Sequence, residues 1–174
     1  MPAKKKNNRF AGFTLAELTV VIAILSLVAL LVIPRLPSTT EGYLKDSARN
    51  LASTVRYLAD LAIATKTGYR LRLNLAAGNT EITRILPSGE EVEARDSLLN
   101  RQPLREGIVF EDITISRAGK QTAGTVILDF SPLGVDDFVL FHLKSELSDR
   151  YYTVALYPGS GRVEVSEGYQ EGVS

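Results

Sequence analysis

An uninterrupted apolar segment near the N-terminus constrains this chain more than any other feature of its sequence. Residues 13–33 read FTLAELTVVIAILSLVALLVI, and as an α-helix they would extend roughly 31 Å, the thickness of one bilayer core. Four basic residues precede this segment: Lys4, Lys5, Lys6 and Arg9. By the positive-inside rule, the N-terminus is predicted to stay in the cytoplasm and the chain after Pro34 to be exported.

A cleaved secretory signal peptide and a plain membrane anchor are two alternative interpretations of the segment. A signal peptide needs small residues at a cleavage site after the apolar run, whereas this run is followed by Pro34-Arg35-Leu36-Pro37. A plain anchor fits the hydropathy but does not explain Glu17, the one ionisable residue inside the segment. A carboxylate in hydrocarbon costs about 2.5–3.5 kcal/mol, so Glu17 is expected to have a partner.

A third interpretation rests on the residues at the cytoplasmic end of the segment. The run Gly12-Phe13-Thr14-Leu15-Ala16-Glu17-Leu18, after a short basic leader, resembles the type IV pilin and type II secretion pseudopilin family. The resemblance implies cleavage between Gly12 and Phe13 by a prepilin peptidase, N-methylation of Phe13 and retention of the apolar helix. It also implies that Glu17 pairs with the N-terminal amine of a neighbouring subunit during assembly.

Pro34 lies at the distance from the cleavage site at which pilins similarly carry a proline. Proline removes an amide donor and clashes with the carbonyl four residues earlier, so we expect the helix to kink or loosen near residues 30–34. Pro37 and the polar residues 38–40 predict a break or a loose turn after it.

A second helix is predicted after this break. Apolar residues recur there at alternating steps of four and three: Leu44, Ala48, Leu51, Val55, Leu58 and Ala62. This spacing is typical of an amphipathic helix, which we expect to start after Thr40 and to stop at Gly68. A coiled-coil partner is an alternative, but the stripe spans only about three heptads and lacks clear charged flanks, which favours packing on a sheet.

From Tyr69 onward the apolar period changes from helical to two, which is typical of half-buried strands. Strands are predicted at residues 69–75, 80–86, 108–116, 125–131, 138–143, 151–157 and 162–166, with residues 95–107 as a loop. Glycine and proline occupy the turns between them, which predicts antiparallel pairing. The predicted fold class is α+β, with a long N-terminal helix packed on an antiparallel sheet domain.

These patterns and the resemblance together predict four parts of the chain. The resemblance implies that residues 1–12 form a leader that the peptidase removes, and residues 13–34 are expected to form the transmembrane or filament-core helix. Residues 35–67 form the amphipathic helix. Residues 68–174 form the exported antiparallel β domain.

Two segments of the predicted β domain indicate one branch of this family. Phe130-Ser131-Pro132-Leu133-Gly134 and residues 152–165, which contain Gly161-Arg162-Val163, resemble the closing half of the H-type minor pseudopilins and FimT-like minor pilins, the GspH/FimT group. This implies a minor pseudopilin near the tip of a type II secretion pseudopilus, which assists protein export across the outer membrane. A FimT-like minor type IV pilin in pilus assembly, adhesion or DNA uptake is the alternative within the family.

The family also implies partners and a location. The partners are other pilins or pseudopilins in a filament, the prepilin peptidase and an inner-membrane assembly platform. Before assembly the chain would cross the bacterial inner membrane once, with a cytoplasmic N-terminus and a periplasmic C-terminal domain.

The residues predict no catalytic, metal or cofactor site, and a membrane-anchored enzyme or binding domain is the alternative from another class. His142, the only histidine, has no cysteine and no obvious serine partner, so we expect a structural or surface role. Asp136 and Asp137 lack the additional oxygen ligands that calcium needs, and Gly159-Ser160-Gly161 lacks the lysine and helix of a phosphate loop. Twenty basic and 20 acidic residues balance, and the C-terminus is acidic, so we expect no nucleic-acid partner.

Overall fold

The computed structural model describes residues 14–32, 39–94, 96–159 and 161–172. The chain divides into two compact units, residues 1–37 and residues 38–174. The first contains helix α1, Leu15–Val32, and the second contains helix α2, Thr39–Thr65, and all of the strands described. Each unit is considered by itself.

Helix α1 is apolar on every side, so it has no polar face of its own. The hydroxyls of Thr19 and Ser26 are satisfied within the helix, because they donate to the carbonyls of Leu15 (2.9 Å) and Ile22 (2.8 Å). Within the described part of the chain, no helix reaches the length and hydropathy of a membrane span. The predicted segment 13–34 extends beyond α1 at both ends, and its kink at Pro34 lies outside the described residues.

Helix α2 has the amphipathic pattern that the sequence predicts. Its buried side chains form one stripe: Leu44, Ala48, Leu51, Val55, Leu58, Ala59 and Ala62. The helix ends in a Schellman motif, in which Lys66 N–H donates to Ile63 O (3.4 Å) and Thr67 N–H to Ala62 O (3.2 Å). The expected stop at Gly68 was wrong in this detail: Lys66 takes the left-handed position (φ 50°), and Gly68 already begins β1.

The strands form two antiparallel sheets. The first has the order β3-β2-β1-β6, and the second has the order β5-β4-β7-β8-β9. The first contains β1 Gly68–Asn74, β2 Asn79–Ile85, β3 Glu91–Glu93 and β6 Thr125–Phe130. The second contains β4 Ile108–Ile115, β5 Gly119–Gln121, β7 Val139–Ser145, β8 Ser148–Leu156 and β9 Val163–Glu167. Strands β3 and β5 were not predicted, because three residues are too few to show an alternating pattern.

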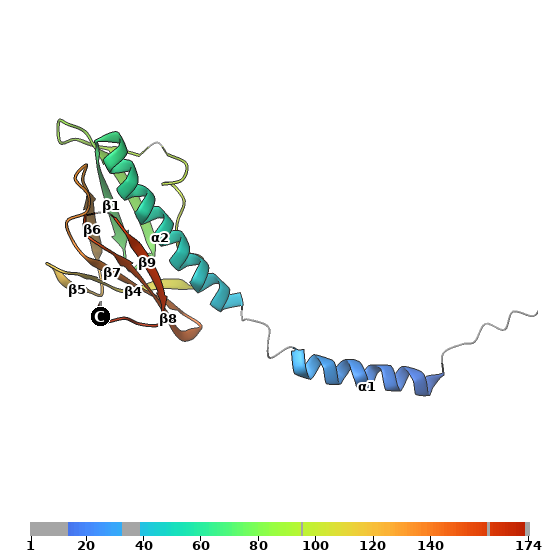
Figure 1. Ribbon diagram of the computed structural model, residues 1–174. Coiled ribbons are helices and arrows are strands. Elements are labelled where there is room, and N and C mark those ends of the chain that lie inside the picture. Colours follow the sequence, from blue (N-terminus) through green and yellow to red (C-terminus); the bar gives the residue numbers. More distant parts are fainter. Residues whose placement is uncertain (1–13, 33–38, 95, 160, 173–174) are drawn as a thin grey trace, which may run out of the picture. The chain divides into compact units, whose positions relative to one another are not determined.

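One hydrophobic core joins α2 to both sheets, as Figure 1 shows for the helix running along the strands. Leu71 and Phe130 come from the first sheet, and Phe141 and Leu156 come from the second; all are almost completely buried. Seven of the strands fall where the two-residue period indicates, and their antiparallel pairing confirms the α+β class.

A β-bulge in β4 determines which of its side chains reach the core. Phe110 pairs with Leu143 and Asp112 pairs with His142, so Glu111 is the extra residue. The bulge shifts the alternation by one position, and both Phe110 and Ile113 remain buried although they lie three residues apart. Asp112 therefore comes to lie directly across from His142.

Candidate assembly site and buried polar cluster

Thr14 and Glu17 form a capping box at the start of α1. The Glu17 N–H donates to Thr14 Oγ1 (3.2 Å), while the Thr14 N–H (3.2 Å) and hydroxyl (3.1 Å) both donate to Glu17 Oε2. These reciprocal bonds satisfy amides that would otherwise lack a partner at a helix N-terminus. The carboxylate also lies where the helix dipole favours negative charge.

In the structure described, the Glu17 carboxylate bonds to Thr14, the residue that precedes α1. The pairing of Glu17 with a neighbour's amine, which the family resemblance implies, is a proposal that one chain does not test. Gly12 and Phe13, the predicted cleavage and methylation site, lie outside the described residues.

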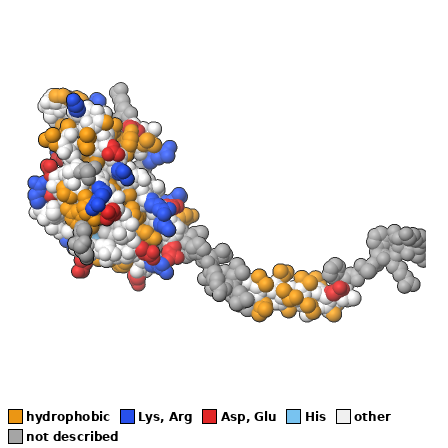
Figure 2. Space-filling model, in the orientation of Figure 1, with side chains coloured by type: hydrophobic (Ala, Val, Ile, Leu, Met, Phe, Trp, Pro, Cys, Tyr) orange, Lys and Arg blue, Asp and Glu red, His pale blue; other side chains and the backbone are white. Residues whose placement is uncertain are grey.

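The described surface of α1 is mostly apolar, with Glu17, Thr19 and Ser26 as its polar side chains. All of its side chains from Leu15 to Val28 are exposed, and the exposed fraction of Leu15 reaches 84%. Figure 2 shows hydrophobic side chains along α1, whereas the visible face of the domain mixes hydrophobic and charged groups. Exposed apolar surface of this kind is typical of a segment that contacts lipid or other protein chains.

A buried polar cluster lies on the second sheet, around Asp112 and His142. His142 Nδ1 lies 2.7 Å from Asp112 Oδ1, and both side chains are at most 1% exposed. The other ring nitrogen, Nε2, lies 2.9 Å from the carbonyl oxygen of Gln170. Since a carbonyl only accepts, Nε2 carries a proton, and the ring has no free nitrogen to act as a base.

Asp112 accepts further hydrogen bonds on its second oxygen. The Tyr169 hydroxyl donates to Oδ2 (2.9 Å), and Lys120 Nζ lies 3.1 Å from the same atom. Burial raises the pKa of the Asp112 carboxyl, but the hydrogen bonds from His142, Tyr169 and Lys120 outweigh burial and hold it below its usual value. The Tyr169 and Asp112 bonds in turn raise the pKa of Lys120, so the cluster holds a stable carboxylate and ammonium.

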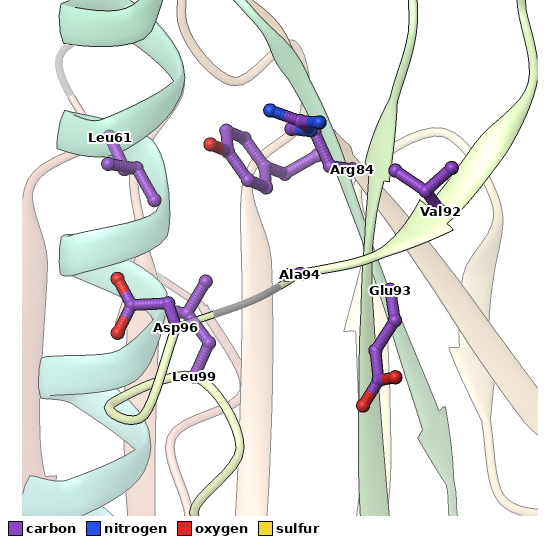
Figure 3. A pocket seen from close by; sticks show the side chains of 8 residues that line it. Leu61, Arg84, Val92, Glu93, Ala94, Asp96 and Leu99 are labelled. Carbon is purple, nitrogen blue, oxygen red and sulfur yellow. The ribbon is translucent and has the colours of Figure 1, made fainter.

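A pocket of about 530 Å³ lies between α2, the first sheet and the loop after β3. Figure 3 shows Leu61 on α2 facing the loop that carries Asp96 and Leu99, with Arg84 and Val92 on neighbouring strands. Asp96 accepts a bond from the Tyr57 hydroxyl (2.7 Å), which lowers the pKa of the carboxyl together with the Leu98 amide. This bond ties the loop to α2, and the lining residues described include no histidine and no serine that could supply a nucleophile.

The turn residues singled out in the sequence have structural roles. Gly134 (φ 108°) lies so close to Gly159 that a Cβ would come within 2.2 Å of the Gly159 carbonyl oxygen. Gly159 N–H donates to Val135 O (2.8 Å), which joins the turn after β6 to the turn after β8. Asp137 accepts from Arg117 Nε at 2.5 Å, and within the described ranges no group of three acidic or histidine side chains could hold a metal.

Reasoning from the sequence missed most of the buried cluster. His142 was expected to have a structural or surface role, and it is buried, but its partners Asp112, Tyr169 and Gln170 were not predicted. The available signal was Asp112 itself, a carboxylate inside the otherwise apolar strand Ile108–Ile115. Two features explain why Asp112 is buried: the bulge in β4, and the contact of Tyr169 and Gln170 with the sheet. Neither feature produces a periodic pattern in the sequence.

Comparisons with known proteins gave matches to the N-terminal segment and to the fold of the domain. Residues 7–33 match the family model of the prokaryotic N-terminal methylation motif. No curated protein sequence matches the chain.

Among solved structures, the domain is similar to the minor pseudopilin EpsH from the type 2 secretion system of Vibrio cholerae. One structure of EpsH gives a TM-score of 0.59 at 13% identity over 75% of this chain and 98% of that one. A second gives 0.55 at 14% identity over 72% and 97%. The type IV minor pilin FimU of Pseudomonas aeruginosa gives 0.49 at 16% identity over 75% and 92%.

The two EpsH structures show a shared fold, and the methylation motif is an independent match in a different part of the chain. Together they confirm the resemblance of this chain to the type IV pilin and type II secretion pseudopilin family.

Proposed function

We propose that this chain is a minor subunit of a pilin-like filament, an H-type pseudopilin near the tip of a type II secretion pseudopilus that assists protein export. The observation that carries the proposal is the presence, in one chain, of an N-terminal methylation motif and a domain with the fold of a minor pseudopilin. Neither feature alone separates this role from that of a membrane anchor or of an unrelated α+β domain.

The apolar helix supports an assembly role. We propose that residues 13–34 hold the precursor in the inner membrane, with the leader in the cytoplasm and the domain in the periplasm. After cleavage, the exposed apolar surface of α1 packs against the helices of other subunits. Glu17, capped by Thr14 before assembly, exchanges its local hydrogen bonds for the amine of a neighbouring subunit.

The buried cluster supports a structural role for the domain, and we propose that the chain is not an enzyme. Asp112 and His142 resemble two members of a hydrolase triad, but both nitrogens of His142 are engaged and the pair is covered by Tyr169 and Gln170. A general base must reach a substrate proton, which this histidine cannot do in the structure described.

Processing of the N-terminus tests the proposal directly. Co-expression with a prepilin peptidase is expected to remove residues 1–12 and to leave a methylated Phe13, as measured by mass spectrometry of the membrane fraction. Gly12→Val is expected to block the cut, since a β-branched side chain cannot adopt the compact backbone available to glycine. An intact Met1 terminus beside an active peptidase, or a cut after Pro34, would contradict the proposal.

The choice between secretion and a pilus needs a second measurement. A methylation motif is equally compatible with a FimT-like minor type IV pilin that acts in pilus assembly, adhesion or DNA uptake. Deletion of the gene, followed by assays of secreted protein and of surface pili in the same strain, separates the two. Loss of secretion with normal pili supports the pseudopilin, and the reverse result supports the pilin.

A further inference from the structure

The C-terminal segment, residues 168–172, folds back over the outer face of the second sheet after β9. Gly168 makes the turn with φ 90°, and its N–H donates to Tyr151 O (2.8 Å). The two residues that follow, Tyr169 and Gln170, contact Asp112 and His142. The deep burial of that acid–histidine pair therefore depends on the short segment that follows β9.

The sheet holds this segment by its main chain. The Thr153 hydroxyl donates to Gly168 O (2.7 Å) and accepts from Gln170 N–H (3.0 Å), so a single side chain contacts both sides of Tyr169. His142 Nε2 donates to Gln170 O (2.9 Å). Paired contacts to successive backbone groups, made by side chains of a sheet, are how proteins bind extended peptides.

The side chain of Tyr169 enters a matching site. Its ring stacks on His142, with centroids 3.8 Å apart and planes 16° from parallel, and meets Tyr151 edge-on at 5.8 Å. Its hydroxyl donates to Asp112 Oδ2 (2.9 Å) and accepts from Lys120 Nζ (2.7 Å). Phenylalanine could fill the same space, but it would leave the carboxylate and the ammonium without the hydroxyl between them. We name these five residues the tail slot: Asp112, Lys120, His142, Tyr151 and Thr153.

We propose that the tail slot is a peptide-binding site that can take the C-terminal segment of a second copy of this chain in place of the chain's own. The segment joins β9 through the single turn at Gly168, so rotation of the backbone at that turn can move it off the sheet as one unit. A second copy offers the identical Gly-Tyr-Gln sequence, and exchange of identical elements is a low-cost route to association. This contact is independent of α1 and of the filament role.

Two complementary variants of the full-length chain, in detergent, test the exchange. The acceptor ends at Glu167, which leaves its slot empty. The donor carries Asp112→Asn and Thr153→Val, which weaken its own slot and free its tail. Mixing them is expected to give a one-to-one complex by light scattering after size exclusion. Tyr169→Phe in the donor should weaken the complex about tenfold, since bonds to charged groups are lost, and Tyr169→Ala should abolish it.

Controls keep the test decisive. If circular dichroism shows that the acceptor is unfolded, full-length Tyr169→Ala serves as the acceptor, since it keeps every slot residue and removes only the occupying ring. Absence of a complex with a folded acceptor overturns the proposal. So does an equally stable complex with the Tyr169→Ala donor. Equal binding of a labelled tyrosine peptide of unrelated sequence would show that the slot is not selective for a second copy, and would overturn that assignment.

Discussion

Glu17 combines two properties that a single substitution can separate, its role as a cap and its charge. In the structure its carboxylate accepts two bonds from Thr14, so it contributes to the start of α1. Glutamine fills the same position of a capping box as well as glutamate does, because its side-chain oxygen accepts the same bonds. Glu17→Gln therefore removes the charge and leaves the cap.

We expect Glu17→Gln to insert in the membrane normally and to lose assembly. A neutral side chain is easier to place in hydrocarbon, whereas an ion pair with a neighbour's amine is no longer available. Membrane fractionation and cysteine cross-linking to filament partners measure the two steps, and the chain has no native cysteine to interfere. Thr14→Val is the matched control, since it breaks the cap but keeps the charge. Unchanged cross-linking in Glu17→Gln would leave the plain anchor as the better interpretation.

Asp112 makes the stability of the domain depend on pH. Its folded-state pKa lies below the ordinary carboxyl value of about 3.9, because the bonds from His142, Tyr169 and Lys120 outweigh burial. The stabilisation is therefore complete above about pH 4 and is lost as the pH falls through the folded-state pKa.

We expect Asp112→Asn to cost about 3 kcal/mol of unfolding free energy near neutral pH, because it removes the buried carboxylate to which His142, Tyr169 and Lys120 bond. The difference from the wild type should shrink in acid, where the wild-type carboxyl also becomes neutral. Denaturant titrations of both proteins across this range measure it. A difference that stays constant with pH would show that Asp112 acts by packing and not by charge.

At the scale of elements, the sequence predicted regular structure well and irregular structure poorly. The stripe from Leu44 to Ala62 predicted α2, and alternation predicted seven strands, because a long element repeats its burial pattern many times. The bulge at Glu111 and the Schellman end at Lys66 are single events without repetition, so local patterns did not predict them. The buried cluster was missed for the same reason, since it depends on pairing between distant strands and on the returning tail.

Gly134 and Gly159 form a matched pair of turn glycines with different constraints. Both have positive φ, but a Cβ at Gly134 would overlap the Gly159 carbonyl, whereas a Cβ at Gly159 meets nothing within 4 Å. Gly134→Ala is therefore expected to lose at least about 2 kcal/mol of stability, and Gly159→Ala only about 1 kcal/mol. Thermal unfolding of the two variants measures the difference. Equal losses would show that backbone conformation alone, and not the contact between the turns, requires glycine at position 134.

At the scale of the whole molecule, the core belongs entirely to one unit. Every residue of the hydrophobic cluster lies between Leu44 and Val163, in the unit of residues 38–174, and the described side chains of α1 contribute none. The α+β class could be predicted from the sequence because a helical period of apolar residues indicates a helix and a period of two indicates a strand. The division of the strands into two sheets could not, since alternation does not tell which strands become neighbours.

We expect residues 38–174, expressed without the apolar segment, to form a folded domain with mixed helix and strand content and one cooperative melt, measured by circular dichroism. Leu51→Asp should abolish folding, because Leu51 is completely buried and an unpaired carboxylate there costs several kcal/mol against a total stability of about 5–15 kcal/mol. Leu133→Asp is the matched control: its side chain is 94% exposed, so the same chemical change should leave the melting temperature nearly unchanged. A helix-only spectrum for residues 38–174, or equal effects of the two substitutions, would contradict a core built from α2 and both sheets.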